Sequence, residues 1–150
     1  MKNLYTLLGL VAFVLAAFVI QSFSVPQQSD PWNSKQLMEP SDLAKIIEGK
    51  TNQKVYVYSI GPAALIKNSI DIGEGSNANN IAKLKEQVSK LPKDAQIVIY
   101  CGCCPFKNCP NVRPAFSLLN EMKFTNHKLL NLSNNLREDW IAKGYPTVSQ

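Results

Sequence analysis

The 150-residue sequence has no internal repeat, no low-complexity tract and a single histidine, His127. The first two absences exclude a solenoid built from repeats and a low-complexity disordered chain. The histidine lies far along the sequence from every cysteine, which disfavours a mixed cysteine–histidine metal site. We expect His127 at the surface or at a strand edge.

Long runs of one charge are also missing. The chain has 16 Lys and Arg against 11 Asp and Glu, a formal net charge of +5, and its lysines are scattered along the sequence. A nucleic-acid-binding face would gather them, so we expect no nucleic-acid partner. A mildly basic surface is suited to attracting small anions.

The N-terminal segment is the one long hydrophobic run. Lys2 precedes an apolar stretch over 7–20, and small polar residues follow it. This pattern predicts an export signal, residues 1–24, cut after Ser24, with an uncleaved membrane anchor as the alternative. No cysteine lies near it, which disfavours a lipid-anchored protein. We therefore expect an exported protein, periplasmic or otherwise extracytoplasmic.

The remainder is long enough for one domain with one core and too short for two. Residues 25–39 are polar and flanked by proline, which predicts a linker whose Trp32 and Leu37 can dock on the domain. We expect the domain itself over 40–150, as a monomer.

Strand patterns alternate with helix patterns through this domain. Strands are predicted at 54–58, 69–72, 95–100 and 127–132, and helices at 41–49, 77–91, 111–122 and 136–143. Alternation of this kind predicts an α/β fold with a parallel, doubly wound sheet of about five strands and flanking helices.

All four cysteines, Cys101, Cys103, Cys104 and Cys109, fall within nine residues. They follow the apolar strand 95–100 and precede a helix that Asn111 is expected to cap. Such a strand-to-helix loop lies at the carboxyl end of a parallel sheet, where ligands bind. Disulfides between cysteines this close would enclose only tiny loops, so any that form should be strained or switchable.

A helix N-terminus favours an anion, and the thiolate is the reactive form of cysteine. We therefore expect Cys101 to have a lowered pKa and to be the nucleophile. Lys107 and Arg113 are expected to add positive charge beside it, and Gly102 lets the backbone turn sharply after it. These three residues are the predicted substrate-binding residues.

Two motifs resemble a rhodanese-like domain of the sulfurtransferase family. The first is Val98-Ile99-Tyr100-Cys101, and the second is the C-terminal Trp140 followed by Gly144-Tyr145-Pro146. The resemblance spans about residues 40–148. It implies a rhodanese-like fold without a cofactor, in which a Cys101 persulfide carries sulfur from a small anionic donor such as thiosulfate to a thiol or cyanide acceptor.

The chain also departs from the family pattern. Arg113 lies twelve residues after Cys101, farther than the family's basic residue, so the active-site loop is longer. The family's Asp-Val-Arg after the second strand is replaced by the sequence at 57–61, and its Gly-His-Ile by Ala64-Leu65-Ile66. These differences imply a larger or reshaped pocket.

Two other functions fit the cysteine cluster. Cys101-Gly102-Cys103-Cys104 contains a Cys-x-x-Cys motif, as in thiol–disulfide redox proteins, and Cys103, Cys104 or Cys109 could resolve an intermediate on Cys101. Close thiolates could also bind zinc or copper(I), although four ligands in nine residues are crowded for a tetrahedral site. We expect no bound metal.

Overall fold

Five short strands form an all-parallel sheet in the order β1-β5-β4-β2-β3 in the computed structural model, which describes residues 29–148. The strands are β1 (Leu37–Met38), β2 (Tyr56–Ser59), β3 (Ser69–Asp71), β4 (Ile97–Tyr100) and β5 (His127–Leu130). β4 lies at the centre and is buried along its whole length. The predicted parallel α/β sheet is confirmed.

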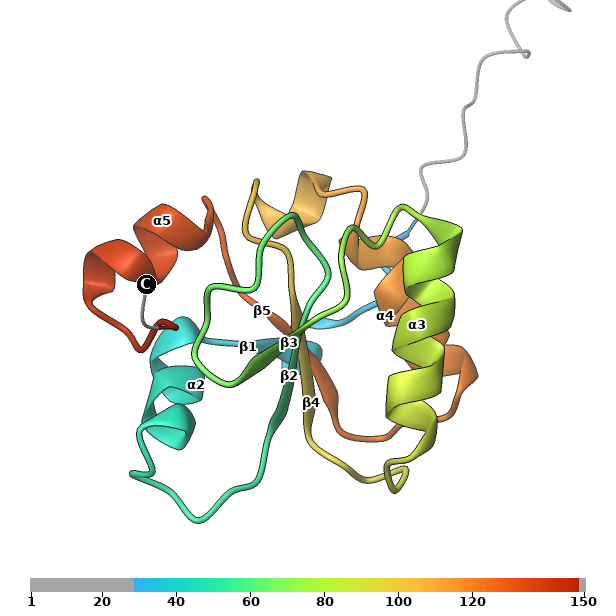
Figure 1. Cartoon of the computed structure of the whole chain (residues 1–150), viewed down its shortest axis with the longest axis horizontal. Helices are drawn as coiled ribbons and strands as arrows, with labels where there is room; N and C mark the ends of the chain where they lie inside the picture. Colours follow the sequence, from blue (N-terminus) through green and yellow to red (C-terminus); the bar gives the residue numbers. More distant parts are fainter. Residues whose placement is uncertain (1–28, 149–150) are drawn as a thin grey trace, which may run out of the picture.

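Helices cover both faces of the sheet (Figure 1). α3 (Ala78–Ser89) and α4 (Val112–Glu121) pack on one face, and α2 (Pro40–Ile47) and α5 (Leu136–Asp139) on the other. Short 3-10 helices complete the structure: η2 (Ser34–Gln36), η3 (Phe106–Asn108) and η4 (Ile141–Lys143).

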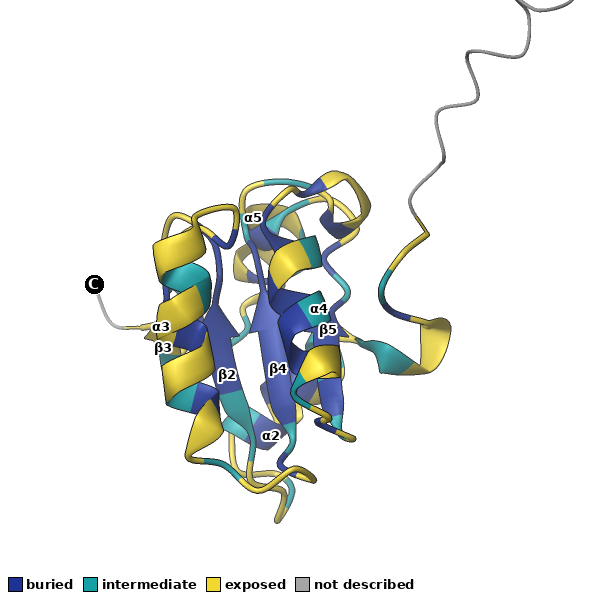
Figure 2. Cartoon of the chain, turned by 90° about the vertical axis from the view of Figure 1, so that its right-hand side faces the viewer, coloured by how far each residue is buried: buried dark blue, intermediate teal, exposed yellow. Residues whose placement is uncertain are grey.

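The alternation of side chains along β4 divides the interior into two cores. Ile97 and Ile99 face the core under α3 and α4, whereas Val98 and Tyr100 face the core under α2 and α5. Figure 2 shows the buried strands between helices whose outer faces are exposed. Cys101 continues the alternation, so its side chain lies on the same face of the sheet as Ile97 and Ile99 and belongs to the core under α3 and α4.

Two predicted helix boundaries need correction. The helix predicted at 41–49 is α2, which begins one residue earlier at Pro40, because proline is well suited to the first helical position. The predicted final helix is broken into α5 and η4 at Trp140, whose backbone leaves the helical region while its indole N–H donates to the Pro146 carbonyl at 2.9 Å. Gly49 and Gly144, which follow α2 and η4, are left-handed, with φ of 73° and 70°, as is usual for a glycine that ends a helix.

Much of the predicted linker belongs to the folded unit. Leu37 and Met38 form the edge strand β1 beside β5, and Trp32 is only 8% exposed. The Trp32 ring packs edge-on against Phe106 at 5.9 Å and Phe116 at 5.7 Å between ring centroids.

The predicted export signal and residues 25–28 of the linker lie outside the described residues. Between residues 29 and 148, no helix is both long and apolar enough to cross a bilayer.

The expectation that His127 lies at the surface or at a strand edge is wrong. The residue is 3% exposed, its ring packs on Phe116 with centroids 4.6 Å apart, and its Nδ1 donates to the Phe124 carbonyl. β1 borders β5 on its outer side, which makes β5 an interior strand. Burial lowers the pKa of His127, so the ring is favoured in its neutral form.

We expect Trp32→Ala to lower the free energy of unfolding by about 3 kcal/mol, because the truncation leaves a cavity against Phe106 and Phe116. Ile70→Ala is the control, since Ile70 is 41% exposed and its truncation should change stability by less than about 0.5 kcal/mol. Urea unfolding measures both. Equal, small effects would show that the segment before Pro40 does not stabilise the domain.

Candidate active site

Cys101 is the first residue after β4, at the carboxyl end of the central strand. It is 2% exposed, and its sulfur lies against the chain that leaves β2. A Cβ at Gly61 would lie 2.9 Å from the Cys101 Sγ, so only glycine leaves room for the sulfur there. The segment that follows β2 therefore forms one wall of the Cys101 site.

The cysteine loop folds back on itself, so that three sulfurs meet. The Sγ atoms of Cys101, Cys103 and Cys109 all lie within 4.8 Å of one another, and none of the four cysteines is in a disulfide. Cys101 Sγ is 3.3 Å from Cys103 Sγ, which in turn is 3.4 Å from Cys104 Sγ. The 3-10 helix η3 reverses the chain between Cys104 and Cys109. The predicted strand-to-helix placement of the cysteines is confirmed.

Hydrogen bonds lower the pKa of Cys101 to about 5. The Cys109 thiol makes the largest contribution, and the backbone N–H of Cys103, the Asn111 amide and the Cys103 thiol add to it, while burial opposes them. The donors are affected in the opposite sense. The bond to Cys101 and burial raise the pKa of Cys109, and burial and the bond to Cys101 raise the pKa of Cys103 to about 12. At neutral pH the cluster holds one thiolate, on Cys101, with thiols at Cys103 and Cys109.

The prediction that Asn111 caps α4 is wrong. Its backbone is already helical, and its side chain makes no capping bond. The amide instead donates to Cys101 Sγ at 3.4 Å and accepts from the Ser76 N–H at 3.0 Å. A Cβ at Gly75 would overlap the Asn111 carbonyl oxygen, so glycine is needed for this approach. The sequence does not reveal this role, since an asparagine before a helix has the same pattern as a cap.

Arg113 forms an ion pair with Asp30. Its Nη2 is 2.6 Å from Asp30 Oδ1 and also donates to the Lys107 carbonyl, and its guanidinium lies 5.2 Å from the centre of the Trp32 ring. Lys107 is exposed in η3. The lowered pKa of Cys101 is caused by the hydrogen bonds described above and not by these two cations. Contact of Arg113 or Lys107 with a substrate stays a prediction.

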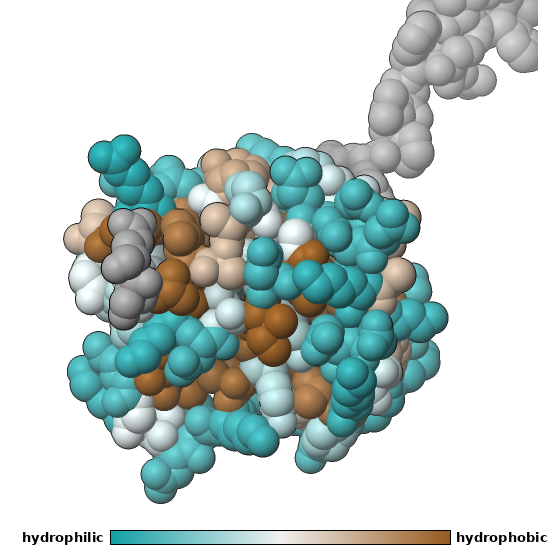
Figure 3. Space-filling view, in the orientation of Figure 1, coloured by the Kyte–Doolittle hydropathy of each residue, from teal (hydrophilic) through white to brown (hydrophobic). Residues whose placement is uncertain are grey.

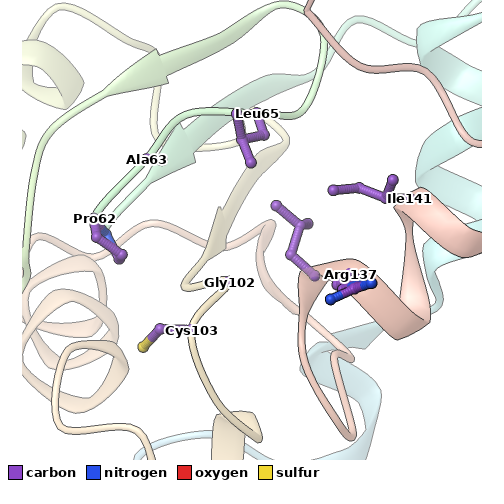
Figure 4. Close-up of a pocket in the computed structure, with 8 residues that line it drawn as sticks. Pro62, Ala63, Leu65, Gly102, Cys103, Arg137 and Ile141 are labelled. Carbon is purple, nitrogen blue, oxygen red and sulfur yellow. The ribbon is translucent and has the colours of Figure 1, made fainter.

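A cavity of about 180 Å³ lies on the other side of the loop at Gly102. Gly102 packs on α5, where a Cβ would be 2.7 Å from the Leu136 Cβ. Cys103 and Pro62 lie at one end of the cavity and Arg137 and Ile141 at the other (Figure 4). Its lining is mainly apolar: Pro62, Ala63, Leu65, Gly102, Cys103, Leu136, Arg137 and Ile141.

This cavity combines apolar walls with a positive charge. Arg137 supplies the charge, and Ile141 is one of the large apolar side chains that are exposed among the described residues. Figure 3 shows hydrophobic surface interspersed among the hydrophilic side chains on one face of the molecule. Sequence reasoning missed Arg137, because nothing in its local pattern distinguishes it from the other exposed cations of a helix.

Cys101, Cys103 and Cys109 also have the spacing to offer three sulfur ligands to a soft ion such as copper(I). Metal binding would require the thiols to lose their protons. The hydrogen bonds within the cluster instead favour one thiolate and two thiols. The arrangement is therefore better suited to activating a single nucleophile.

No family model matches the chain, and no curated protein matches it. The function of the chain is therefore inferred from the geometry of the cysteine loop.

We expect the thiolate absorbance of the reduced protein to disappear on acidification with a midpoint near pH 5, as the Cys101 thiolate takes up its proton. Asn111→Ala should raise this midpoint by roughly one pH unit, because a donor to a charged sulfur is lost. Asn108→Ala is the matched control, since its side chain makes no hydrogen bond within residues 29–148. A midpoint near the ordinary thiol value of 9.0 in the unchanged protein would contradict this account.

Proposed function

We propose that the chain is an exported sulfurtransferase of the rhodanese-like type. In this proposal Cys101 takes a sulfane sulfur from a small anionic donor such as thiosulfate and gives it to a thiol or cyanide acceptor. The observation that carries the proposal is the position of Cys101 at the carboxyl end of β4, where its Sγ accepts from the Asn111 amide at 3.4 Å and lies within 4.8 Å of Cys109 Sγ. These neighbours lower the pKa of Cys101 to about 5. The five-stranded parallel sheet is compatible with the fold that the sequence motifs imply.

The chemistry would proceed in two steps. The Cys101 thiolate attacks the outer sulfur of thiosulfate, the sulfur–sulfur bond of the donor breaks, and sulfite leaves with the electron pair. The product is a persulfide anion on Cys101. The acceptor then attacks the outer sulfur and restores the thiolate. The Cys109 thiol and the Asn111 amide are positioned to stabilise negative charge at Cys101 in both steps.

The cavity beside Gly102 supports this proposal with a place for an anion to approach. Arg137 brings positive charge to its rim, and Cys103 lies at its other end. Cys101 itself is 2% exposed, so a donor reaches its sulfur only when the loop at Gly102 and Cys103 moves aside. The long loop then serves to shield the persulfide from water between the two steps.

Thiol–disulfide exchange is the second candidate, because the Sγ atoms of Cys101 and Cys103 are 3.3 Å apart. The two functions differ in the covalent intermediate. A persulfide adds about 32 Da to the protein, whereas a disulfide removes about 2 Da. Intact mass after exposure to thiosulfate, and again after a reductant, separates them.

Cys101→Ser should abolish sulfur uptake from thiosulfate. An oxygen nucleophile forms no persulfide, so the rate should fall more than about a hundredfold, equivalent to about 3 kcal/mol of barrier. Rapid-quench mass spectrometry follows the reaction. Cys104→Ser is the control that keeps uptake, since the Cys104 sulfur contacts Cys103 rather than Cys101. Uptake by Cys101→Ser at a near-normal rate would rule out this mechanism.

Arg137→Gln should raise the thiosulfate concentration needed for half-maximal persulfide formation by about fivefold, or about 1 kcal/mol, since Arg137 is exposed to solvent. The maximal rate should change little, because Arg137 lies at the far end of the cavity from Cys103. Arg113→Ala tests the other arginine, whose charge is paired with Asp30. A larger rise for Arg113→Ala than for Arg137→Gln would place the donor on the α4 side instead.

A further inference from the structure

Cys103 is the exposed member of the sulfur cluster that touches the nucleophile. Its Sγ is 3.3 Å from Cys101 Sγ, and it is exposed, whereas Cys101 and Cys109 are buried. Cys104 contacts Cys103 and is partly exposed. Cys103 therefore connects the buried thiolate to solvent.

Building on the proposed function, we propose that Cys103 resolves the Cys101 persulfide, releasing the transferred sulfur as sulfide and leaving a Cys101–Cys103 disulfide. The terminal electron source of the cycle is then a dithiol reductant rather than cyanide. This adds a second activity, persulfide reduction to sulfide, to sulfur uptake from the donor.

The step balances without a further reagent. The Cys103 sulfur attacks Cys101 Sγ, the bond between Cys101 Sγ and the outer sulfur breaks, and the outer sulfur takes the bonding electrons. The Cys103 thiol proton passes to that sulfur, which leaves as HS⁻. The two cysteine sulfurs are oxidised together by two electrons, and the sulfane sulfur is reduced by two. A dithiol then reduces the disulfide and becomes a disulfide itself.

The protonation state of Cys103 suits this role. Partial burial of the thiol and its bond to Cys101 raise the pKa of Cys103 to about 12, so the thiol is protonated at neutral pH. Sulfide is a poor leaving group as a dianion. When the Cys103 thiol gives its proton to the outer sulfur, that sulfur can leave as HS⁻ instead. The same thiol becomes the attacking sulfur as the proton leaves.

Cys109 is less suited to resolution. It is 1% exposed and belongs to the α3–α4 core, so a disulfide to Cys109 would be closed to an external reductant. Its thiol is also the leading donor that stabilises the Cys101 thiolate. A disulfide to Cys103 leaves one of its two sulfurs at the surface, beside the cavity at Gly102. This disulfide closes a ring of only three residues, and the strain in so small a ring makes the bond easy to reduce.

The test is a single turnover of the reduced protein with thiosulfate under argon, with excess donor removed and neither thiol nor cyanide added. Sulfide is quantified, and intact mass is recorded with time. The unchanged protein should first gain about 32 Da, then release one equivalent of sulfide and end about 2 Da below its reduced mass. Cys104→Ser, the matched control, should do the same.

Cys103→Ser should gain about 32 Da and keep it, with sulfide release slowed more than about a hundredfold. Persulfide formation in this variant also shows that it is folded and that uptake is intact. A stable persulfide in the unchanged protein, or sulfide release from Cys103→Ser at the normal rate, would overturn the role of Cys103 while leaving sulfur uptake standing. Absence of any persulfide in all variants, Cys103→Ser included, would overturn both proposals.

Discussion

The site depends on the close packing of three sulfurs, because the Sγ atoms of Cys101, Cys103 and Cys109 all lie within 4.8 Å of one another. Within this cluster the Cys109 thiol is the leading cause of the low pKa of Cys101, and η3 lies in the loop between Cys104 and Cys109. Cationic side chains are not needed for this low pKa. Sulfur and amide donors that lie at the buried end of a strand stabilise the charge, in surroundings where a hydrogen bond is electrostatically stronger than in water.

The rest of the fold keeps that loop in place. Trp32, from the segment before the first helix, packs against Phe106 in η3, and the Phe106 N–H donates to the Leu132 carbonyl beyond β5. On the opposite side, the Gly102 carbonyl accepts from the Leu136 N–H at the start of α5. The loop is thus fixed by elements from both ends of the domain, which explains how a segment rich in proline and cysteine can hold one defined sulfur arrangement.

Sequence reasoning recovered the features that are local. The alternation of helices and strands and the strand that ends at Tyr100 both follow from short-range patterns, and the structure has them. It did not find β1, because two residues carry no detectable periodicity. The burial of His127 was also missed, since it depends on the packing of the ring against Phe116 of α4.

In the site, too, the sequence indicates local features but not the partners that tertiary packing brings together. The position of Cys101 after a buried strand is visible in the sequence, whereas its donors are not. The Asn111 side chain is held at the sulfur by the Ser76 N–H, thirty-five residues earlier, which donates to its Oδ1. Arg113 pairs with Asp30, eighty-three residues earlier. Such partners are set by tertiary packing, and no spacing rule within the cysteine loop reveals them.

The most direct test of the central claim is a crystal structure of the reduced protein soaked briefly with thiosulfate, with anomalous scattering used to locate sulfur. The crystal is of the Cys103→Ser variant, in which the persulfide is expected to persist. We expect one additional sulfur peak about 2 Å from Cys101 Sγ, a distance equal to the length of a sulfur–sulfur bond. A peak bonded to another cysteine while Cys101 stays unmodified, or a metal ion bridging Cys101, Cys103 and Cys109, would contradict it.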